Sequence, residues 1–219
     1  DVMKAAVDEG RLGTVISASA YVKWHREQEY YSSSDWKGTW AFDGGGALMN
    51  QGIHSLDFLI HLMGDPVEVK AYMNTPVKKG VEVETNLVAI LKFPSGALGT
   101  IEASTEIYPG YKKRIEICGN SGSISMVENK LERWDFRKKK TKDAGITKRF
   151  SQQVSHGGGA SDPLAISFEG HRRQFQELVN VVKGKRKGLS CDGEEGLRSV
   201  KVVNAIYKSA QTNKTVKLK

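Results

Sequence analysis

Residues 44–57 read Gly-Gly-Gly-Ala-Leu-Met-Asn-Gln-Gly-Ile-His-Ser-Leu-Asp, a glycine run followed by a segment that predicts a helix up to residue 63. Four polar residues stand in this segment at spacings of 4, 3 and 4 residues: Asn50, His54, Asp57 and His61. On an α-helix these spacings place the four side chains on one face, within roughly 60° of one another. Apolar residues cover nearly all the rest, so the helix is expected to be buried.

Polar groups on a buried helix are costly unless they are hydrogen-bonded or face a wet cleft. Two interpretations of the polar face therefore stay open. In the first it is a structural cluster, in which Asp57 orients His54 and Asn50 bonds backbone groups. In the second it is the wall of an active site.

The segments on either side of this helix predict strands. Residues 13–24 alternate with period 2, as a long strand does, and residues 25–43 show no clear period and are predicted to be a loop. Further strands are predicted over residues 67–74, 83–93, 97–105, 114–118, 123–127, 130–136 and 215–218, with short turns between most of them. Helices are predicted over 164–183 and 193–212, and 138–162 is predicted to be an irregular excursion.

Consecutive strands with short links imply an antiparallel sheet. The predicted fold class is therefore α+β: one large, mainly antiparallel sheet with helices packed on one face, the other face being available for oligomerisation. Residues 1–219 are expected to form a single domain. Residues 1–10 read as the end of a helix stopped by Gly10, with no initiator Met, so we expect something upstream.

Composition is that of an ordinary globular protein, with 39% hydrophobic and 26% charged residues. No apolar run is long enough for a membrane span and no signal segment opens the chain, which predicts a cytoplasmic protein without a membrane partner. Cys118 and Cys191 suit a reduced compartment. The net charge of +8 comes largely from two basic segments without stacking aromatics, so we expect a solvated surface and no nucleic-acid partner.

The order and spacing of several motifs resemble the substrate-side domain of the glucose-fructose oxidoreductase / inositol dehydrogenase family (Gfo/Idh/MocA). They run over almost the whole chain, at residues 8–13, 36–40, 44–54, 62–69, 93–99, 170–171, 194–196, 207–210 and 216–218. Relatives in this family exchange a hydride between a sugar or cyclitol carbon and a nicotinamide cofactor, NAD or NADP, held by an upstream Rossmann domain. The resemblance implies a small-molecule sugar or polyol substrate, and it implies that residues 1–10 lead from a missing cofactor domain.

The resemblance also assigns roles on the polar helix. His54 matches the catalytic histidine of the family, which takes the hydroxyl proton when hydride leaves the carbinol carbon. Asn50 stands where the family often has aspartate; it can position a substrate hydroxyl but cannot raise the basicity of His54 as a carboxylate would. Asp57 is expected among the substrate-binding residues, where it could orient His54, or it could pair elsewhere.

The loop after the first strand has the composition of a carbohydrate pocket, in which aromatic faces and charged groups bind a sugar. We expect substrate contacts from Trp24, Arg26 and Tyr31, although some of the aromatics could simply anchor the loop. By resemblance, Trp36 and Lys37 approach the cofactor, with Lys37 where an arginine is common. His171 is a candidate near the substrate, or a structural residue at a helix start.

The chain has no recognisable dinucleotide site of its own, because neither glycine run has the G-x-G-x-x-G order after a strand. The family's Lys-Pro segment is also missing, so these residues alone are predicted to be inactive. No metal site is expected, because no ligand set has suitable spacing. The alternative function is a non-catalytic carbohydrate-binding or scaffold protein. Either protein is expected to form a homo-oligomer, a dimer or a tetramer.

Overall fold

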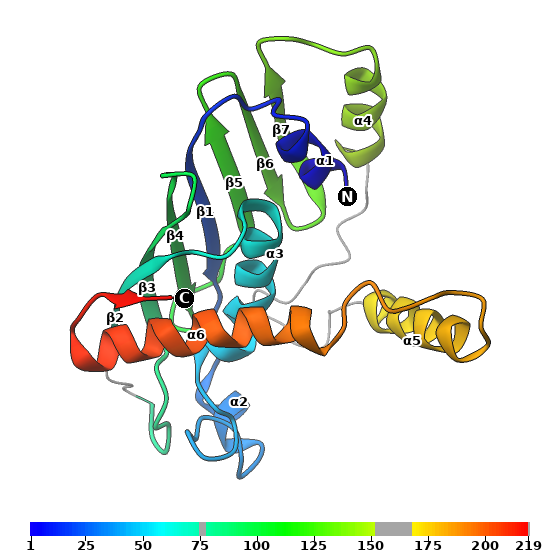
Figure 1. Ribbon diagram of the computed structural model, residues 1–219. Coiled ribbons are helices and arrows are strands. Elements are labelled where there is room, and N and C mark those ends of the chain that lie inside the picture. Colours follow the sequence, from blue (N-terminus) through cyan, green and yellow to red (C-terminus); the bar gives the residue numbers. More distant parts are fainter. Residues whose placement is uncertain (75–77, 152–167, 219) are drawn as a thin grey trace.

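The computed structural model describes residues 1–74, 78–151 and 168–218, and its centre is one eight-stranded sheet (Figure 1). The strand order is β7-β6-β5-β1-β4-β3-β2-β8. The strands are β1 Val15–Lys23, β2 Glu68–Met73, β3 Asn86–Lys92, β4 Leu98–Ser104, β5 Arg114–Gly119, β6 Gly122–Val127, β7 Lys130–Phe136 and β8 Val216–Lys217. The helices are α1 Val2–Asp8, α2 Gln28–Ser32, the π-helical turn η1 Ala47–Gly52, α3 Ile53–Met63, α4 Lys142–Ser151, α5 Glu169–Val182 and α6 Gly193–Thr212.

The sheet consists of two antiparallel meanders joined by the first strand. Strands β2, β3 and β4 form one meander, and β5, β6 and β7 form the other. Strand β1 lies between them, parallel to β4 and antiparallel to β5. This arrangement confirms the predicted α+β class with a mainly antiparallel sheet.

Period-2 alternation decides which side chains face the helices. In β3, Leu87, Ala89 and Leu91 are buried, while Val88 and Ile90 point to the opposite face. The buried face packs against α3 and α6, which cross it in Figure 1. Each large apolar side chain buried there contributes about 1.5–3 kcal/mol of hydrophobic stabilisation.

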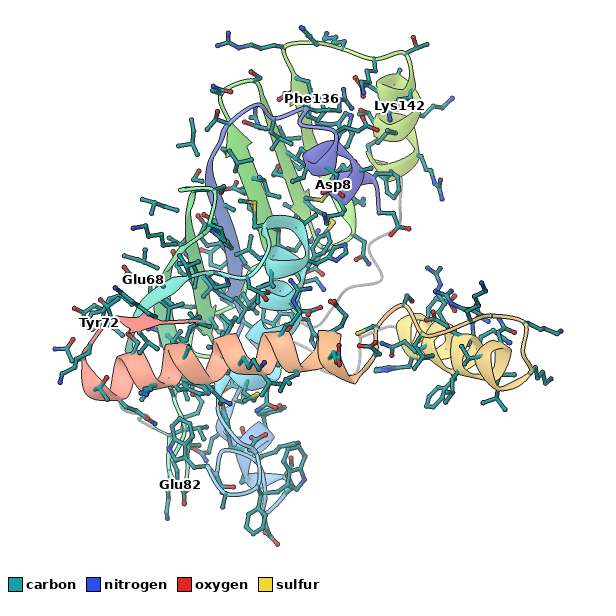
Figure 2. The ribbon with its side chains drawn as sticks, viewed as in Figure 1. Asp8, Glu68, Tyr72, Glu82, Phe136 and Lys142 are labelled. Atoms are coloured by element: carbon teal, nitrogen blue, oxygen red, sulfur yellow. The ribbon has the colours of Figure 1, made fainter. Side chains whose placement is uncertain are left out.

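The opposite face of the sheet keeps large apolar groups in solvent. Tyr72 is 64% exposed, Leu98 56% and Ile90 53%. Figure 2 shows Tyr72 and Glu68 on β2, near one edge of the sheet. Ion pairs such as Lys23 with Glu102 lie among these residues. No helix in the described ranges covers this face, as predicted.

One helix lies where an irregular excursion was predicted. Helix α4 packs Ile146 and Phe150 against the core, one helical turn apart. Asp143 in its first turn forms a bidentate ion pair with Arg11, with both nitrogen–oxygen distances at 2.7 Å, and accepts a hydrogen bond from the Trp134 indole at 3.0 Å. The irregular prediction was therefore wrong over residues 142–151, because a distant arginine anchors this segment.

The Arg11 guanidinium lies 3.8 Å from the centroid of the Phe136 ring. Phe136 and Lys142 lie at the end of the molecule that also carries Asp8 (Figure 2). The remaining part of the predicted excursion, residues 152–162, lies outside the described residues, as do residues 164–167 of the predicted helix 164–183.

Candidate functional site

The glycine turn before the predicted polar helix is bound by a buried carboxylate. Glu84 is 1% exposed, and its two oxygens accept hydrogen bonds from the backbone N–H groups of Gly46 at 2.9 Å and Leu48 at 2.8 Å. The backbone carbonyl of Glu84 accepts from the N–H of Ala47 at 3.0 Å. Burial raises the pKa of Glu84, and the N–H donors oppose this rise.

A hydroxyl group from the closing helix completes this contact. Tyr207 of α6 donates its O–H to the Glu84 carboxylate at 3.1 Å. The hydroxyl oxygen of Tyr207 in turn accepts from the backbone N–H groups of Gly46 and Met49, both at 3.3 Å. The Tyr207 ring packs edge-to-face on Trp40, with 5.3 Å between centroids. Burial beside the Glu84 carboxylate raises the pKa of Tyr207, so the phenol stays protonated.

The segment after the glycine turn begins as a π-helix, η1, and only from Ile53 onward as an α-helix. The prediction of an α-helix that follows the glycine run and ends at residue 63 was therefore wrong over residues 47–52. Asn50 lies in the π-helical turn, and its amide nitrogen donates to Asp43 at 2.8 Å and to the carbonyl of Gly45 at 3.2 Å. The structure thus gives Asn50 both a backbone and a carboxylate acceptor.

His54 lies on the first turn of α3, beside a groove of about 160 Å³ between α3 and strands β5 and β6. The other lining residues are Ser55, Phe58, Lys113, Ile115, Met126, Glu128 and Asn129. Part of the His54 side chain is exposed to solvent.

The surroundings of His54 favour the neutral imidazole. Partial desolvation of the ring lowers the pKa of His54 from its usual 6.5, and the positive charge of Lys113 lowers it further. Asp57 opposes this change and raises the pKa, while His171 adds to the lowering. This direction favours the uncharged ring, which is able to accept a proton.

Asp57 does not hydrogen-bond to His54. Its carboxylate accepts a hydrogen bond from the Ser199 hydroxyl, which ties α3 to α6. Asp57 therefore acts on His54 through its charge, and its hydrogen bond belongs to helix packing. His61, the last residue of the predicted face, is exposed and stacks on Phe58 with 6.4 Å between the two rings.

The three expected substrate contacts from the loop are buried within it. Trp24 is 8% exposed and Arg26 3%, and the Arg26 guanidinium lies 5.1 Å from the Trp24 ring and donates to the carbonyl of His25 at 2.7 Å. The Tyr31 hydroxyl is hydrogen-bonded to Thr105 at 2.8 Å, and burial raises the pKa of Tyr31 to about 12. A short helix, α2, also interrupts the predicted loop.

Trp36 and Lys37 are more accessible. Trp36 is 49% exposed and lines a wide open groove of about 580 Å³ with Phe42 and residues 32–35. The ammonium group of Lys37 donates to the Ser33 hydroxyl at 2.9 Å and lies 4.5 Å from the Tyr30 ring. These two expected cofactor contacts therefore lie together on the same loop surface.

His171 lies near the N-terminal end of α5, a helix that projects away from the sheet in Figure 1. Its side chain is exposed, and its electrostatic effect on His54 is the smallest of the four that act on that residue. The assignment of His171 to the substrate site stays a prediction.

The glycine run does not provide a phosphate cradle. The N–H groups of Gly46, Ala47 and Leu48 are all bonded to Glu84, so none of the three is left to bind an anion. The second glycine run, residues 157–159, lies outside the described residues. The described residues therefore supply no dinucleotide cradle at this helix start.

Within residues 1–74, 78–151 and 168–218, no three histidine, cysteine or acidic side chains lie close enough together to hold a metal ion. No helix in those ranges has the length and apolar character that a membrane crossing needs.

Four residues at the site were not predicted as site residues from the sequence: Asp43, Glu84, Lys113 and Tyr207. Residues 83–93 read as one strand, so nothing singled out Glu84 as a ligand for the glycine turn. Tyr207 carried a usable signal, because it falls on the apolar face of α6 with Val203 and Ile206, where a buried hydroxyl needs a hydrogen-bond partner.

The sequence of the chain is similar to those of two curated dehydrogenases. The chain is 28% identical to myo-inositol 2-dehydrogenase of Thermotoga maritima over 182 residues, which are 80% of this chain and 49% of that protein. It is 22% identical to D-xylose 1-dehydrogenase [NADP(+)] of Haloarcula marismortui over 217 residues, covering 98% of this chain and 56% of that protein. The chain thus spans about half the length of these curated relatives.

Among solved structures, the chain is similar to the WlbA dehydrogenase of Bordetella pertussis, determined in complex with NADH and UDP-GlcNAcA. The TM-score is 0.85 and the identity 30%, over 100% of this chain and 60% of that one. The family model described as the GFO/IDH/MocA C-terminal domain matches residues 1–125, more than half of the chain. The chain therefore belongs to the GFO/IDH/MocA family, as a C-terminal domain of that family.

Proposed function

We propose that this chain is the substrate-binding and oligomerisation domain of an NAD(P)-dependent dehydrogenase that oxidises a CH–OH group of a sugar, polyol or nucleotide sugar. The observation that carries the proposal is His54, a neutral imidazole with a lowered pKa at the edge of a groove, in a member of this family. The relatives named above act on inositol and xylose or bind a nucleotide sugar.

His54 is the base in this proposal. Its neutral ring accepts the proton of the substrate hydroxyl as the C–H bond of the carbinol breaks. A bound nicotinamide cofactor supplies the hydride acceptor. The lowered pKa favours the uncharged ring, which is the form of His54 that acts as a base.

Asn50 orients the substrate. Its amide nitrogen donates to Asp43 and Gly45, which turns its carbonyl oxygen away from those two acceptors and leaves it to accept a hydrogen bond from a substrate hydroxyl. His171 provides a further group near the substrate. Asp57 tunes the charge on His54 while it holds α6.

The loop between β1 and η1 shapes the pocket. Trp24, Arg26 and Tyr31 form its packed base, and the exposed Trp36 with Lys37 faces the cofactor. Lys37 brings a single charge without the bidentate fork of an arginine. The cofactor itself is held mainly by a Rossmann domain outside this chain, so we expect these 219 residues alone to be inactive.

Oligomerisation is assigned to the open face of the sheet. Tyr72, Ile90 and Leu98 expose apolar surface there, and a second copy of the chain would remove it from water. We place the protein in the cytoplasm, because Cys118 and Cys191 are both free thiols.

The test is His54→Ala in the full-length oxidoreductase, assayed with NAD and NADP against a panel of sugars, polyols and nucleotide sugars. We expect turnover to fall by about 100-fold or more while the affinity for the cofactor stays unchanged. His61→Ala is the matched control, since His61 lies two turns further along the same helix and is exposed.

Turnover that His54→Ala leaves unchanged would refute the assignment of the base. Sugar binding by the full-length protein without oxidation, and without any effect of either nicotinamide cofactor, would instead indicate a non-catalytic carbohydrate-binding or scaffold protein.

A further inference from the structure

Two buried polar side chains without a direct part in the proposed chemistry converge on the glycine turn. Glu84 is 1% exposed and Tyr207 5% exposed, and they come from segments 123 residues apart in the sequence. Between them they contact the backbone N–H groups of Gly46, Leu48 and Met49. We call these two side chains and the turn they hold, residues 45–49, the glycine clamp.

The packing in the glycine clamp explains why its first residues are glycines. A Cβ on Gly46 would lie 1.8 Å from the carbonyl oxygen of Glu84, and a Cβ on Gly45 would lie 2.2 Å from the Tyr207 hydroxyl. Both contacts are far below any real Cβ distance. The turn is therefore in close contact with Glu84 and Tyr207, and no space for a side chain remains between them.

The glycine clamp continues into the proposed active site. The carbonyl of Gly45 accepts a hydrogen bond from the Asn50 amide, and Asn50 lies in the π-helical turn that begins at Ala47. His54 follows four residues later, on the first turn of α3. Asn50 and His54 are thus placed by the same turn.

A π-helical turn holds one residue more than an α-helical turn and is retained only where its surroundings favour it. Relaxation of η1 to an α-helix would rotate the residues on its two sides relative to each other by about 100°. An α-helix would also carry Asn50 and His54 on one face, but with a different rotation and rise between them, so the Asn50 carbonyl and the His54 ring would lose the relative placement that η1 gives them.

We propose that Glu84 and Tyr207 are positioning residues, which hold the π-helical turn and thereby align Asn50 with His54. This inference rests on the proposed function for its catalytic part. Its structural part, that the two side chains hold the turn, does not depend on any activity.

The variant Tyr207→Phe removes the hydroxyl and keeps the ring packed on Trp40. Glu84→Gln keeps one acceptor oxygen and places an NH2 group against a backbone donor. The control is Ser209→Ala on the same helix. The Ser209 hydroxyl is fully buried, donates to Lys214 and accepts from the N–H of Ala71, far along the sequence from the glycine turn.

Two measurements are made on each variant. The first is amide hydrogen exchange of residues 46–50 by NMR in the 219-residue chain, together with the titration of the His54 ring. The second is kcat and KM of the full-length oxidoreductase. We expect Tyr207→Phe and Glu84→Gln to speed exchange at these amides at least about tenfold relative to Ser209→Ala. We also expect kcat to fall by about tenfold to a hundredfold, with KM for the cofactor unchanged.

Exchange rates equal to those of Ser209→Ala would overturn the structural part. Faster exchange with an unchanged kcat, in an enzyme that His54→Ala inactivates, would overturn the positioning role. If His54→Ala has no effect on turnover while Tyr207→Phe still speeds exchange, the proposed function fails and the structural part stands.

Discussion

Gly46→Ala tests the packing of the glycine clamp most directly. The added Cβ would meet the Glu84 carbonyl oxygen at 1.8 Å, so the two groups must separate by roughly 1 Å or more. The φ angle of Gly46 is −109°, outside the left-handed region, so we work the magnitude from the clash.

The magnitude follows from the hydrogen bonds that this separation breaks. The N–H groups of Gly46 and Leu48 both donate to the Glu84 carboxylate, and the N–H of Ala47 donates to the Glu84 carbonyl. Hydrogen bonds to a charged acceptor contribute about 1.5–3 kcal/mol each and a neutral one about 1 kcal/mol, so the loss amounts to about 4–7 kcal/mol. A domain of this kind has a total stability of about 5–15 kcal/mol.

The assay is urea unfolding of the 219-residue chain followed by tryptophan fluorescence and circular dichroism. Gly44→Ala is the control: Gly44 has a φ of +74° but no atom within 4 Å of its Cβ position, so the change costs only about 1–2 kcal/mol of backbone strain. We expect the free energy of unfolding of Gly46→Ala to fall by about 4–7 kcal/mol. A loss of stability no greater than that of Gly44→Ala would refute the reasoning.

Three other outcomes are expected. Asp143→Ala leaves the Arg11 side chain, only 4% exposed, without its bidentate partner and should lower the free energy of unfolding by about 3 kcal/mol, as measured by urea titration. Gly145→Ala fills open space on α4 and should raise the melting temperature, because alanine is favoured over glycine in a helix by about 1 kcal/mol. The pKa of His54 is lower in the folded chain than its ordinary 6.5, so its contribution to stability is full above that value and is lost as pH falls through the lowered pKa. When pH is lowered from 7 to below the folded pKa of His54, the free energy of unfolding should therefore fall less in His54→Gln than in the unsubstituted chain, as measured by urea titration at both pH values. Equal falls in the two proteins would contradict this.

Much of the sheet could be predicted from local patterns. Residues 86–92 form a strand within the predicted strand 83–93, although residues 87–91 are all apolar and their sequence does not tell which of them face the helices. Short turns between strands predicted the antiparallel meanders. These features depend on neighbours in the sequence, which is why one chain suffices to find them.

Features that depend on distant residues were missed. The predicted strand 83–93 begins only at Asn86, because Glu84 is drawn to the glycine turn and the N–H of Val83 bonds to the carbonyl of Gly38. Helix α4 depends on Arg11, 132 residues away from Asp143. Local periodicity carries no information on such pairings.

The candidate site shows the same division. The exposure of His54 agrees with the polar stripe in the sequence, which is a local pattern. The π-helical turn was not predicted, because it depends on Glu84 and Tyr207. The α-helix predicted after the glycine run is therefore correct from Ile53 onward and wrong over residues 47–52, which contain Asn50.

The parallel pairing of β1 with β4 has a consequence for how the chain folds. Short turns join the strands within each meander. Strand β1, in contrast, pairs with β4 and β5, which are both far from it in the sequence; the hydroxyls of Ser19 and Thr100, for example, are hydrogen-bonded across 81 residues. Closing such long loops costs entropy before any pairing is gained, and chains rich in non-local contacts fold slowly. We expect the two meanders to form first and the insertion of β1 between them to limit the folding rate, so that mutations in β1 slow refolding more than equally destabilising mutations in β7.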